Sequence, residues 1–170
     1  MIEGIIKKQY KKQRIFVYKL IYFVGDLKIL MLDDFFKNVL SENEFEKKNI
    51  NEYSPLVLAY IGDAVYEVYI RTFLVTVKNA SVHMLHKYST DYVKAKAQSD
   101  IIHKIIEHLT EEEKDVVRRG RNAKSGTIPK NADVTEYKYA TGLESLIGYL
   151  YLKNDTKRLI QILKMCVDCV

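Results

Sequence analysis

The chain has 170 residues, of which 48% are hydrophobic and 29% are charged, a balance typical of a globular domain and not of a disordered polypeptide. Only seven glycines and two prolines are present, too few for a loop-rich all-β fold, so we expect an all-α domain. The net charge of +5 comes from residues 1–30, which hold seven of the 27 basic residues and two of the 22 acidic ones. A nucleic-acid-binding surface must therefore be sought in local clusters of charge.

Residues 1–30 form a head in which basic residues precede an apolar run at 15–24. That run is too short to span a bilayer, and the sequence at 25–28 is a poor signal-peptide cleavage site, so we expect no membrane-spanning or secreted form. A surface membrane anchor and a translation start at Met31 remain alternatives for this head. Over 31–53 we expect a short helix, at 34–40, and a polar linker.

From residue 54 to 170 the pattern is helical, without the alternation typical of strands, and we interpret this range as the catalytic or binding domain. Ser54 and Pro55 predict the N-cap and first turn of a helix that runs to about residue 77. Two further helices are expected over about 82–109, with a break near Ser89 and Thr90.

The second half of this domain begins with a predicted capping box, Thr110 with Glu113, for a charged helix that ends near Gly120. A polar loop is expected to follow it, and then a second apolar helix. The remaining expected boundaries are a loop over 121–133, the apolar helix over about 134–153, and a last helix capped by Asn154 or Asp155.

Two of the predicted helices are apolar on almost every face, and each carries conspicuous acids. Within 55–70 the only charged residues are Asp63 and Glu67, one turn apart, and within 137–152 the only acid is Glu144. Helices this apolar belong at the centre of the domain, where an unpaired carboxylate is unfavourable. Because two such helices must pack together, a divalent cation between their acids would relieve the repulsion. Mg²⁺ suits oxygen ligands and can activate water for attack on a phosphodiester.

Structural ion pairs are the alternative for these acids, because a Lys or Arg at the rim of the core can also neutralise them. For Glu67 this alternative is stronger, and the residue could cap, form an ion pair or support Asp63.

Residues 118–131 gather five basic residues, two glycines and several hydroxyl or amide donors. Basic residues near the C-terminus of a helix complement its dipole, so part of the run needs no ligand. The remainder suits contacts to phosphates and 2′-hydroxyls of RNA, and the absence of aromatic residues argues against stacking on single strands. A solvated loop is the alternative.

The two cysteines, Cys166 and Cys169, have a C-x-x-C spacing but lack a second ligand pair or a thioredoxin-like context. We interpret the spacing as chance placement near the terminus. Without other cysteines or a cleavable signal, we expect a cytoplasmic protein.

Three blocks of the sequence, in the same order, resemble the ribonuclease III family. The stretch Tyr-Ile-Gly-Asp-Ala-Val-Tyr at 60–66 resembles the signature helix of its catalytic domain, and Glu-Ser-Leu-Ile-Gly at 144–148 resembles its second acidic helix. The short branch called Mini-ribonuclease III is more similar, since it also shares Arg-Gly-Arg-Asn-Ala-Lys-Ser-Gly at 119–126, with Pro-Lys-Asn at 129–131. The resemblance covers about 55–163 and excludes the head.

This resemblance implies an all-α ribonuclease III catalytic fold, a homodimer, and Mg²⁺-dependent cleavage of double-stranded RNA that leaves 5′-phosphate and 3′-hydroxyl ends. Asp63 falls on the family's catalytic aspartate and Glu144 on its metal-binding glutamate, so both are expected to be catalytic and to bind the metal. Within the branch, the implied substrate is precursor 23S ribosomal RNA, with a ribosomal protein as an optional helper. Candidates for RNA contact are Arg118, Arg121, Asn122, Lys124 and Lys130.

The sequence also departs from full-length ribonuclease III. Leu56, Ala59 and Thr141 stand where the larger enzymes carry further acids, so we expect a thinner metal site with two certain carboxylates, which Glu67 could supplement. No double-stranded-RNA-binding domain follows within the chain, and the catalytic part is expected to hold RNA through the basic loop. The missing acids leave open a non-catalytic module that binds duplex RNA in ribosome assembly, and the pattern alone leaves open a helical domain with purely structural acids.

Overall fold

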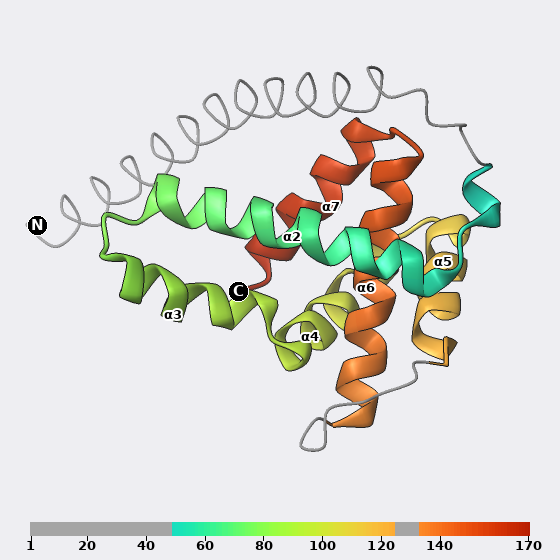
Figure 1. Ribbon diagram of the computed structural model, residues 1–170, viewed down its shortest axis with the longest axis horizontal. Coiled ribbons are helices and arrows are strands. Elements are labelled where there is room, and N and C mark those ends of the chain that lie inside the picture. Colours follow the sequence, from blue (N-terminus) through green and yellow to red (C-terminus); the bar gives the residue numbers. More distant parts are fainter. Residues whose placement is uncertain (1–48, 125–132) are drawn as a thin grey trace, which may run out of the picture. The chain divides into compact units, whose positions relative to one another are not determined.

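The computed structural model describes residues 49–124 and 133–170, which form helices joined by short connections and contain no strand (Figure 1). This confirms the predicted all-α fold. The expected head, the short helix at 34–40 and most of the basic loop, Lys130 included, lie outside these residues. Along the described chain the elements are the 3₁₀ turn η1 (Ile50–Glu52), α2 (Pro55–Val77), α3 (Val82–Val93), α4 (Ala95–Ile105), the 3₁₀ turn η2 (Ile106–His108), α5 (Glu111–Asn122), α6 (Val134–Leu152) and α7 (Thr156–Asp168).

Most helix starts follow the predicted capping signals. Ser54 caps α2, and Thr110 and Glu113 satisfy each other's backbone N–H groups in the capping box of α5. Of the two candidates for α7, Asp155 is the N-cap, whereas Asn154 occupies the left-handed region with φ 60°. None of the described helices is long and apolar enough to pass through a lipid bilayer.

The predicted helix break near Ser89 and Thr90 is wrong. Both hydroxyls donate to backbone carbonyls one turn earlier, of His86 and Lys87, each at 2.7 Å, so both residues remain inside α3. The chain instead breaks at Lys94, whose backbone is extended with ψ 146°.

The predicted helix end near Gly120 is also displaced, because α5 continues to Asn122. Gly120 is buried against α6, where an added Cβ would lie 2.4 Å from the Ser145 Oγ. The glycine therefore allows close helix packing and does not end the helix. As a consequence, Arg121 and Asn122 belong to the last turn of α5 and not to the predicted loop.

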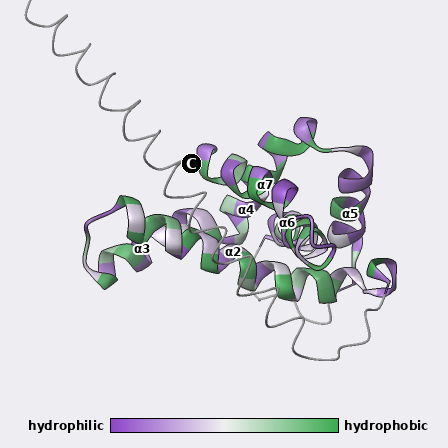
Figure 2. Ribbon diagram, turned by 90° about the horizontal axis from the view of Figure 1, so that it is seen from above, coloured by the Kyte–Doolittle hydropathy of each residue, from purple (hydrophilic) through white to green (hydrophobic). Residues whose placement is uncertain are grey.

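Helix α6 is the central element of the described domain: it crosses behind α2 in Figure 1, with α4 and α5 on opposite sides. Figure 2 shows hydrophobic residues along much of α2, whereas α5 is largely hydrophilic. The two apolar helices thus pack on each other, as their sequences predict. Their fully buried apolar residues are Leu58, Tyr66, Ile70 and Leu74 on α2 and Leu143, Leu146, Ile147 and Leu150 on α6.

The crossing of α2 and α6 is a direct backbone contact at two glycines. A Cβ at Gly62 would lie 1.8 Å from the carbonyl oxygen of Glu144, and a Cβ at Gly148 would lie 1.9 Å from that of Leu58. No side chain fits in either place, so the crossing requires glycine on both helices. Asp63, the residue after Gly62, is therefore held beside the turn of α6 that carries Glu144.

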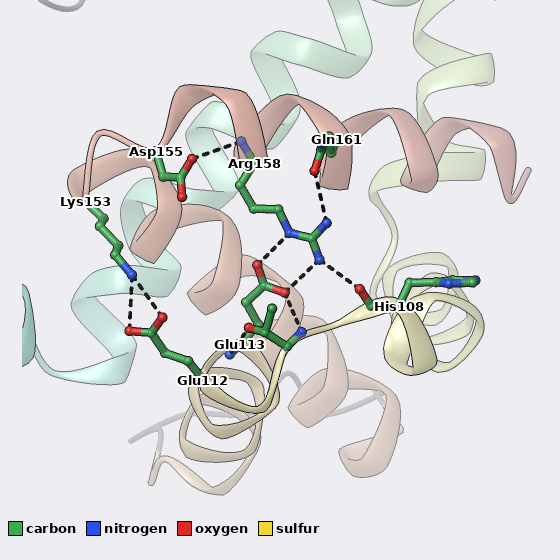
Figure 3. Close-up of polar contacts among 8 residues, drawn as sticks. His108, Glu112, Glu113, Lys153, Asp155, Arg158 and Gln161 are labelled. Carbon is green, nitrogen blue, oxygen red and sulfur yellow. Dashed lines mark hydrogen bonds and ion pairs between the residues drawn. The ribbon is translucent and has the colours of Figure 1, made fainter.

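A network of ion pairs joins α5 to the end of α6 and to α7 (Figure 3). The Arg158 guanidinium donates to both carboxylate oxygens of the buried Glu113, at 2.7 and 2.9 Å, and this contact lowers the pKa of Glu113. Lys153, just after α6, donates to the neighbouring Glu112 at 3.0 Å. This network holds α5, the helix that carries the basic residues, in a defined position against the core.

We predict that Gly148→Ala destabilises the domain by about 3 kcal/mol or more, because the added methyl group forces α2 and α6 apart. Gly142→Ala is the matched control on α6. Its Cβ would lie 3.0 Å from the Val117 carbonyl oxygen, a tight contact but far less severe than that at Gly148, and the helix propensity gained, about 1 kcal/mol, offsets part of the strain, so we expect a smaller loss. Urea unfolding measures both variants, and equal losses would show that the crossing can relax.

Candidate active site

Glu144 lies on α6 and is partly buried, and its carboxyl interacts electrostatically with that of Asp63 on α2. Burial raises the pKa of the Glu144 carboxyl to about 7, and the charge of Asp63 contributes further in the same direction. The amide of Gln98 opposes both effects. The charge of Asp63 thus acts on Glu144, in agreement with the close approach of α2 and α6 at Gly62.

Asp63 is exposed as a residue, yet its pKa is also raised, first by partial burial of the carboxyl and then by the charge of Glu67. A carboxyl that is accessible to a substrate but partly desolvated combines access with a raised pKa. Asp63 therefore lies at the mouth of the site and Glu144 deeper inside it.

Glu67 forms an ion pair with Arg71 on the next turn of α2, which was the alternative considered for it from the sequence. No Lys or Arg within 49–124 or 133–170 forms an ion pair with Asp63 or Glu144. Over this part of the chain, the two central acids are therefore not explained by structural salt bridges.

A metal ion in this site would find few protein ligands. Among the described residues, no three His, Cys, Asp or Glu side chains are grouped as metal ligands. Ala59 and Thr141, which replace acids of the larger enzymes, are buried, and the Thr141 hydroxyl donates to the Tyr137 carbonyl. Two carboxylates that repel each other nevertheless fit a hard divalent cation, such as Mg²⁺, that keeps several water ligands.

Gln98 of α4 is a member of the site that the sequence did not reveal. Its side chain is buried and contacts Glu144, although α4 is more than 40 residues away along the chain. A lone glutamine in an amphipathic helix has no pattern that distinguishes it from a surface residue. Only the packing of α4 on α6 brings it to the site.

The predicted RNA-contact residues that the structure describes lie at the end of α5 or just after it. Arg118 is exposed and pairs with Asp115, and Arg119 lies 3.0 Å from the same carboxylate without hydrogen-bond geometry at its Nε. Asn122 and Lys124 are exposed. The basic cluster is therefore partly neutralised on the side of Asp115.

Arg121 is held differently, by an aromatic side chain of α6. Its Nη1 donates to the Tyr139 hydroxyl at 3.1 Å, and its guanidinium carbon lies 5.4 Å from the centre of that ring. The His103 ring lies against Tyr139 as well, with 4.1 Å between centroids. The Arg121 backbone nitrogen lies 3.7 Å from where a Cβ of Gly142 would be, which places this arginine within one turn of α6 from Glu144. Sequence reasoning identified Arg121 but not its partner Tyr139.

Comparisons of the sequence and the fold with known proteins identify the family of this chain. The family model described as the ribonuclease III domain matches residues 56–155, a range that includes both acids. A crystal structure of a protein from Fusobacterium nucleatum is similar, with a TM-score of 0.64 and 39% identity, over 71% of this chain and 97% of that one. The fold is thus that of a ribonuclease III domain.

Two relatives indicate the branch of this family to which the chain belongs. The Mini-ribonuclease 3 of Thermoanaerobacter sp. (strain X514) is 54% identical over 124 residues, 73% of this chain and 87% of that protein. The Mini-ribonuclease 3 of Clostridium tetani is 50% identical over 126 residues, 74% of this chain and 83% of that protein. The chain therefore belongs to the Mini-ribonuclease III branch of the ribonuclease III family, a branch of endoribonucleases.

We predict that Glu144 makes the metal-free protein less stable as the pH rises. Its pKa is about 7 when folded and 4.5 when unfolded, so between these values the folded state binds more protons, and the free energy of unfolding falls with increasing pH. Relative to wild type, Glu144→Gln should gain stability between pH 4.5 and pH 8, on the order of 2 kcal/mol. Denaturant unfolding in EDTA at several pH values measures this gain, and an unchanged difference between the two proteins would contradict it.

Proposed function

We propose that the chain cleaves double-stranded RNA by metal-assisted hydrolysis, with Asp63 and Glu144 as its catalytic and metal-binding residues. The observation that carries the proposal is the pairing of these two acids across the crossing of α2 and α6, without a cationic partner in the described part of the chain. A protein that needed them only for stability would neutralise them with Lys or Arg. Membership of the ribonuclease III family supports the same chemistry.

Mg²⁺ is the cofactor we propose, because the available donors are carboxylate oxygens and Mg²⁺ usually keeps several water ligands when few protein ligands are available. When bound, it would polarise the scissile phosphate and lower the pKa of a water molecule. Glu144, partly buried on the rigid central helix, would hold the cation from the protein side. Asp63, more exposed, would hold it from the side where the RNA phosphate enters.

The bond changes follow from the proposed products. A water oxygen attacks the phosphorus in line, the P–O3′ bond breaks, and the O3′ atom takes up a proton. One RNA fragment then ends in a 3′-hydroxyl group and the other in a 5′-phosphate group. The protein's part in this step is to orient the phosphate and to fix the two carboxylates, which the glycine crossing does without loop movement.

Duplex RNA would contact the basic cluster at the end of α5. Arg118, Asn122 and Lys124 are exposed there, and we propose them as contacts to phosphates or 2′-hydroxyls, together with Lys130. Arg121 is partly buried, and its hydrogen bond to Tyr139 limits its rotamers. A guanidinium held in this way loses less side-chain entropy when it binds a phosphate.

A homodimer is the assembly we propose, with α2 in its interface. Along this helix Val57, Tyr60, Val68 and Val75 are exposed, Tyr60 to 83%, and burying this apolar surface against a partner would be favourable. A second copy of the chain would bring a second pair of acids to the same duplex.

For the biological substrate we propose the ends of precursor 23S ribosomal RNA in the cytoplasm, with a ribosomal protein as an optional helper. The support is the family branch to which the chain belongs.

Cleavage of a labelled RNA duplex tests the proposed function. We expect cleavage with Mg²⁺ and none with EDTA, and a loss of at least about 10³-fold in kcat for Asp63→Asn or Glu144→Gln, because each removes a proposed metal ligand. Asp100→Asn, at an exposed acid of α4 that pairs with Lys96, is the matched control and should keep full activity. A wild type that binds the duplex but never cuts it would instead be a non-catalytic binding module.

A second prediction concerns Arg121. Arg121→Gln should weaken duplex binding and reduce the slope of log K against log salt by about one, because one phosphate contact is lost. Tyr139→Phe should weaken binding less and leave the slope unchanged, since the arginine remains but is less well oriented. Fluorescence titrations at several salt concentrations measure both effects, with Lys157→Gln on the exposed part of α7 as control. An unchanged slope for Arg121→Gln would exclude a phosphate contact.

A further inference from the structure

Gln98 of α4 presents an unusual combination of burial and missing contacts. The residue is 1% exposed, and its Nε2 has no hydrogen-bond partner among the described residues. Leaving a buried amide N–H unpaired costs about 1–3 kcal/mol, so nearly all such groups in proteins have a partner. An acceptor close to this buried donor is therefore the feature to look for.

The Glu144 carboxyl on α6 is the group of the site with which the Gln98 side chain interacts. An ionised carboxylate only accepts hydrogen bonds, so the amide N–H of Gln98 is the group that can hydrogen-bond to it. The two groups do not reach hydrogen-bond geometry.

Neighbouring polar groups offer no other role for Gln98. Next to it, the buried Ser99 has its backbone carbonyl occupied by the His103 Nδ1 at 2.6 Å. On α6, the Ser145 hydroxyl lies 2.7 Å from the Thr141 carbonyl oxygen and 2.9 Å from that of Pro55, and its one hydrogen is donated within this pair. These groups are satisfied within the fold, whereas the Gln98 Nε2 is not.

We propose that Gln98 is a positioning residue of the metal site: its Nε2 donates to one carboxylate oxygen of Glu144 and so directs the other oxygen toward the cation. This inference rests on the proposed function, because it assumes a cation between Asp63 and Glu144. Groups that hydrogen-bond to metal ligands orient them in this way, and their loss weakens metal binding about 10- to 100-fold.

An amide suits this position better than the other polar side chains. An acid at position 98 would add a third negative charge beside Glu144 and Asp63, and a Lys or Arg would compete with the cation for the same carboxylate. Glutamine supplies the donor without a charge. Its burial between α4 and α6 also restricts its rotamers, so that Glu144 is held without further ordering when the cation binds.

The test is metal binding by the RNA-free protein, followed as the rise in thermal midpoint with Mg²⁺ at pH 8. Wild type should respond to Mg²⁺, and Gln98→Met, similar in volume but without the amide, should need about 10 to 100 times more Mg²⁺ for the same rise. In EDTA, Gln98→Met should be at least as stable as wild type, because an unpaired buried group has been removed. Gln161→Met, at an exposed glutamine of α7, is the matched control and should bind Mg²⁺ as wild type does.

The outcomes separate the two proposals. A wild type that responds to Mg²⁺ together with an unchanged Gln98→Met overturns this inference alone. A folded wild type without any response overturns the proposed metal site, and this inference with it. If Gln98→Met does not fold, the side-chain amide resonance of Gln98 in wild type decides: a downfield shift and slower exchange on addition of Mg²⁺ support the proposal, and an unchanged resonance overturns it.

Discussion

The contact on which the rest of the domain depends is the crossing of α2 and α6 at Gly62 and Gly148. Each glycine faces a backbone carbonyl of the other helix at a distance that no Cβ tolerates. Helices that approach this closely have little freedom to slide or rotate, because their backbones and not their side chains are in contact. The positions of Asp63 and Glu144 are therefore properties of two rigid helices, which is the most accurate way for a protein to hold two like charges together.

The same helix α6 uses another glycine for its second neighbour. Gly142 faces the Val117 carbonyl of α5, and Gly120 of α5 faces Ser145 in return. The basic end of α5 is thereby fixed to the helix that carries Glu144, and the ion pair of Arg158 with Glu113 secures α5 from the other side. The two proposed metal-binding acids and the residues at the end of α5 proposed to contact RNA are thus positioned by contacts with α6, and for Arg118, Arg121 and Asn122 this arrangement does not depend on a loop.

The described residues offer fewer ligands than the coordination shell of a divalent cation contains. The described residues offer two carboxylates and one amide, and positions 59 and 141 carry buried side chains without charge. Water must therefore supply most of the ligands of any cation bound here, and groups behind the carboxylates gain importance because they orient the few ligands that exist. The pKa of Glu144 is raised for a related reason, because no Lys or Arg of the described residues offsets the burial of its carboxyl.

Much of this could be predicted from the sequence. Cap residues such as Ser54 and Thr110 determine helix starts locally, and the apolar character of α2 and α6, with single acids on each, indicates a buried pair of helices and its candidate site. These signals depend on neighbours within one or two turns, which a sequence displays directly. The packing of Gly120 inside α5 and the break at Lys94 could not be predicted in this way, because a glycine or a serine has the same local preference whether it caps a helix or packs inside one.

Which side chains from distant parts of the chain come into contact is shown by the tertiary structure alone. Gln98 reaches Glu144 through the packing of α4 on α6, and Tyr139 reaches Arg121 through that of α5 on α6. The helical class of the domain, most of its helix starts and the two candidate acids can be predicted from the sequence, since their signals are local. The supporting contacts were not, since they depend on the angle and depth of helix crossings that glycines far apart in the chain permit.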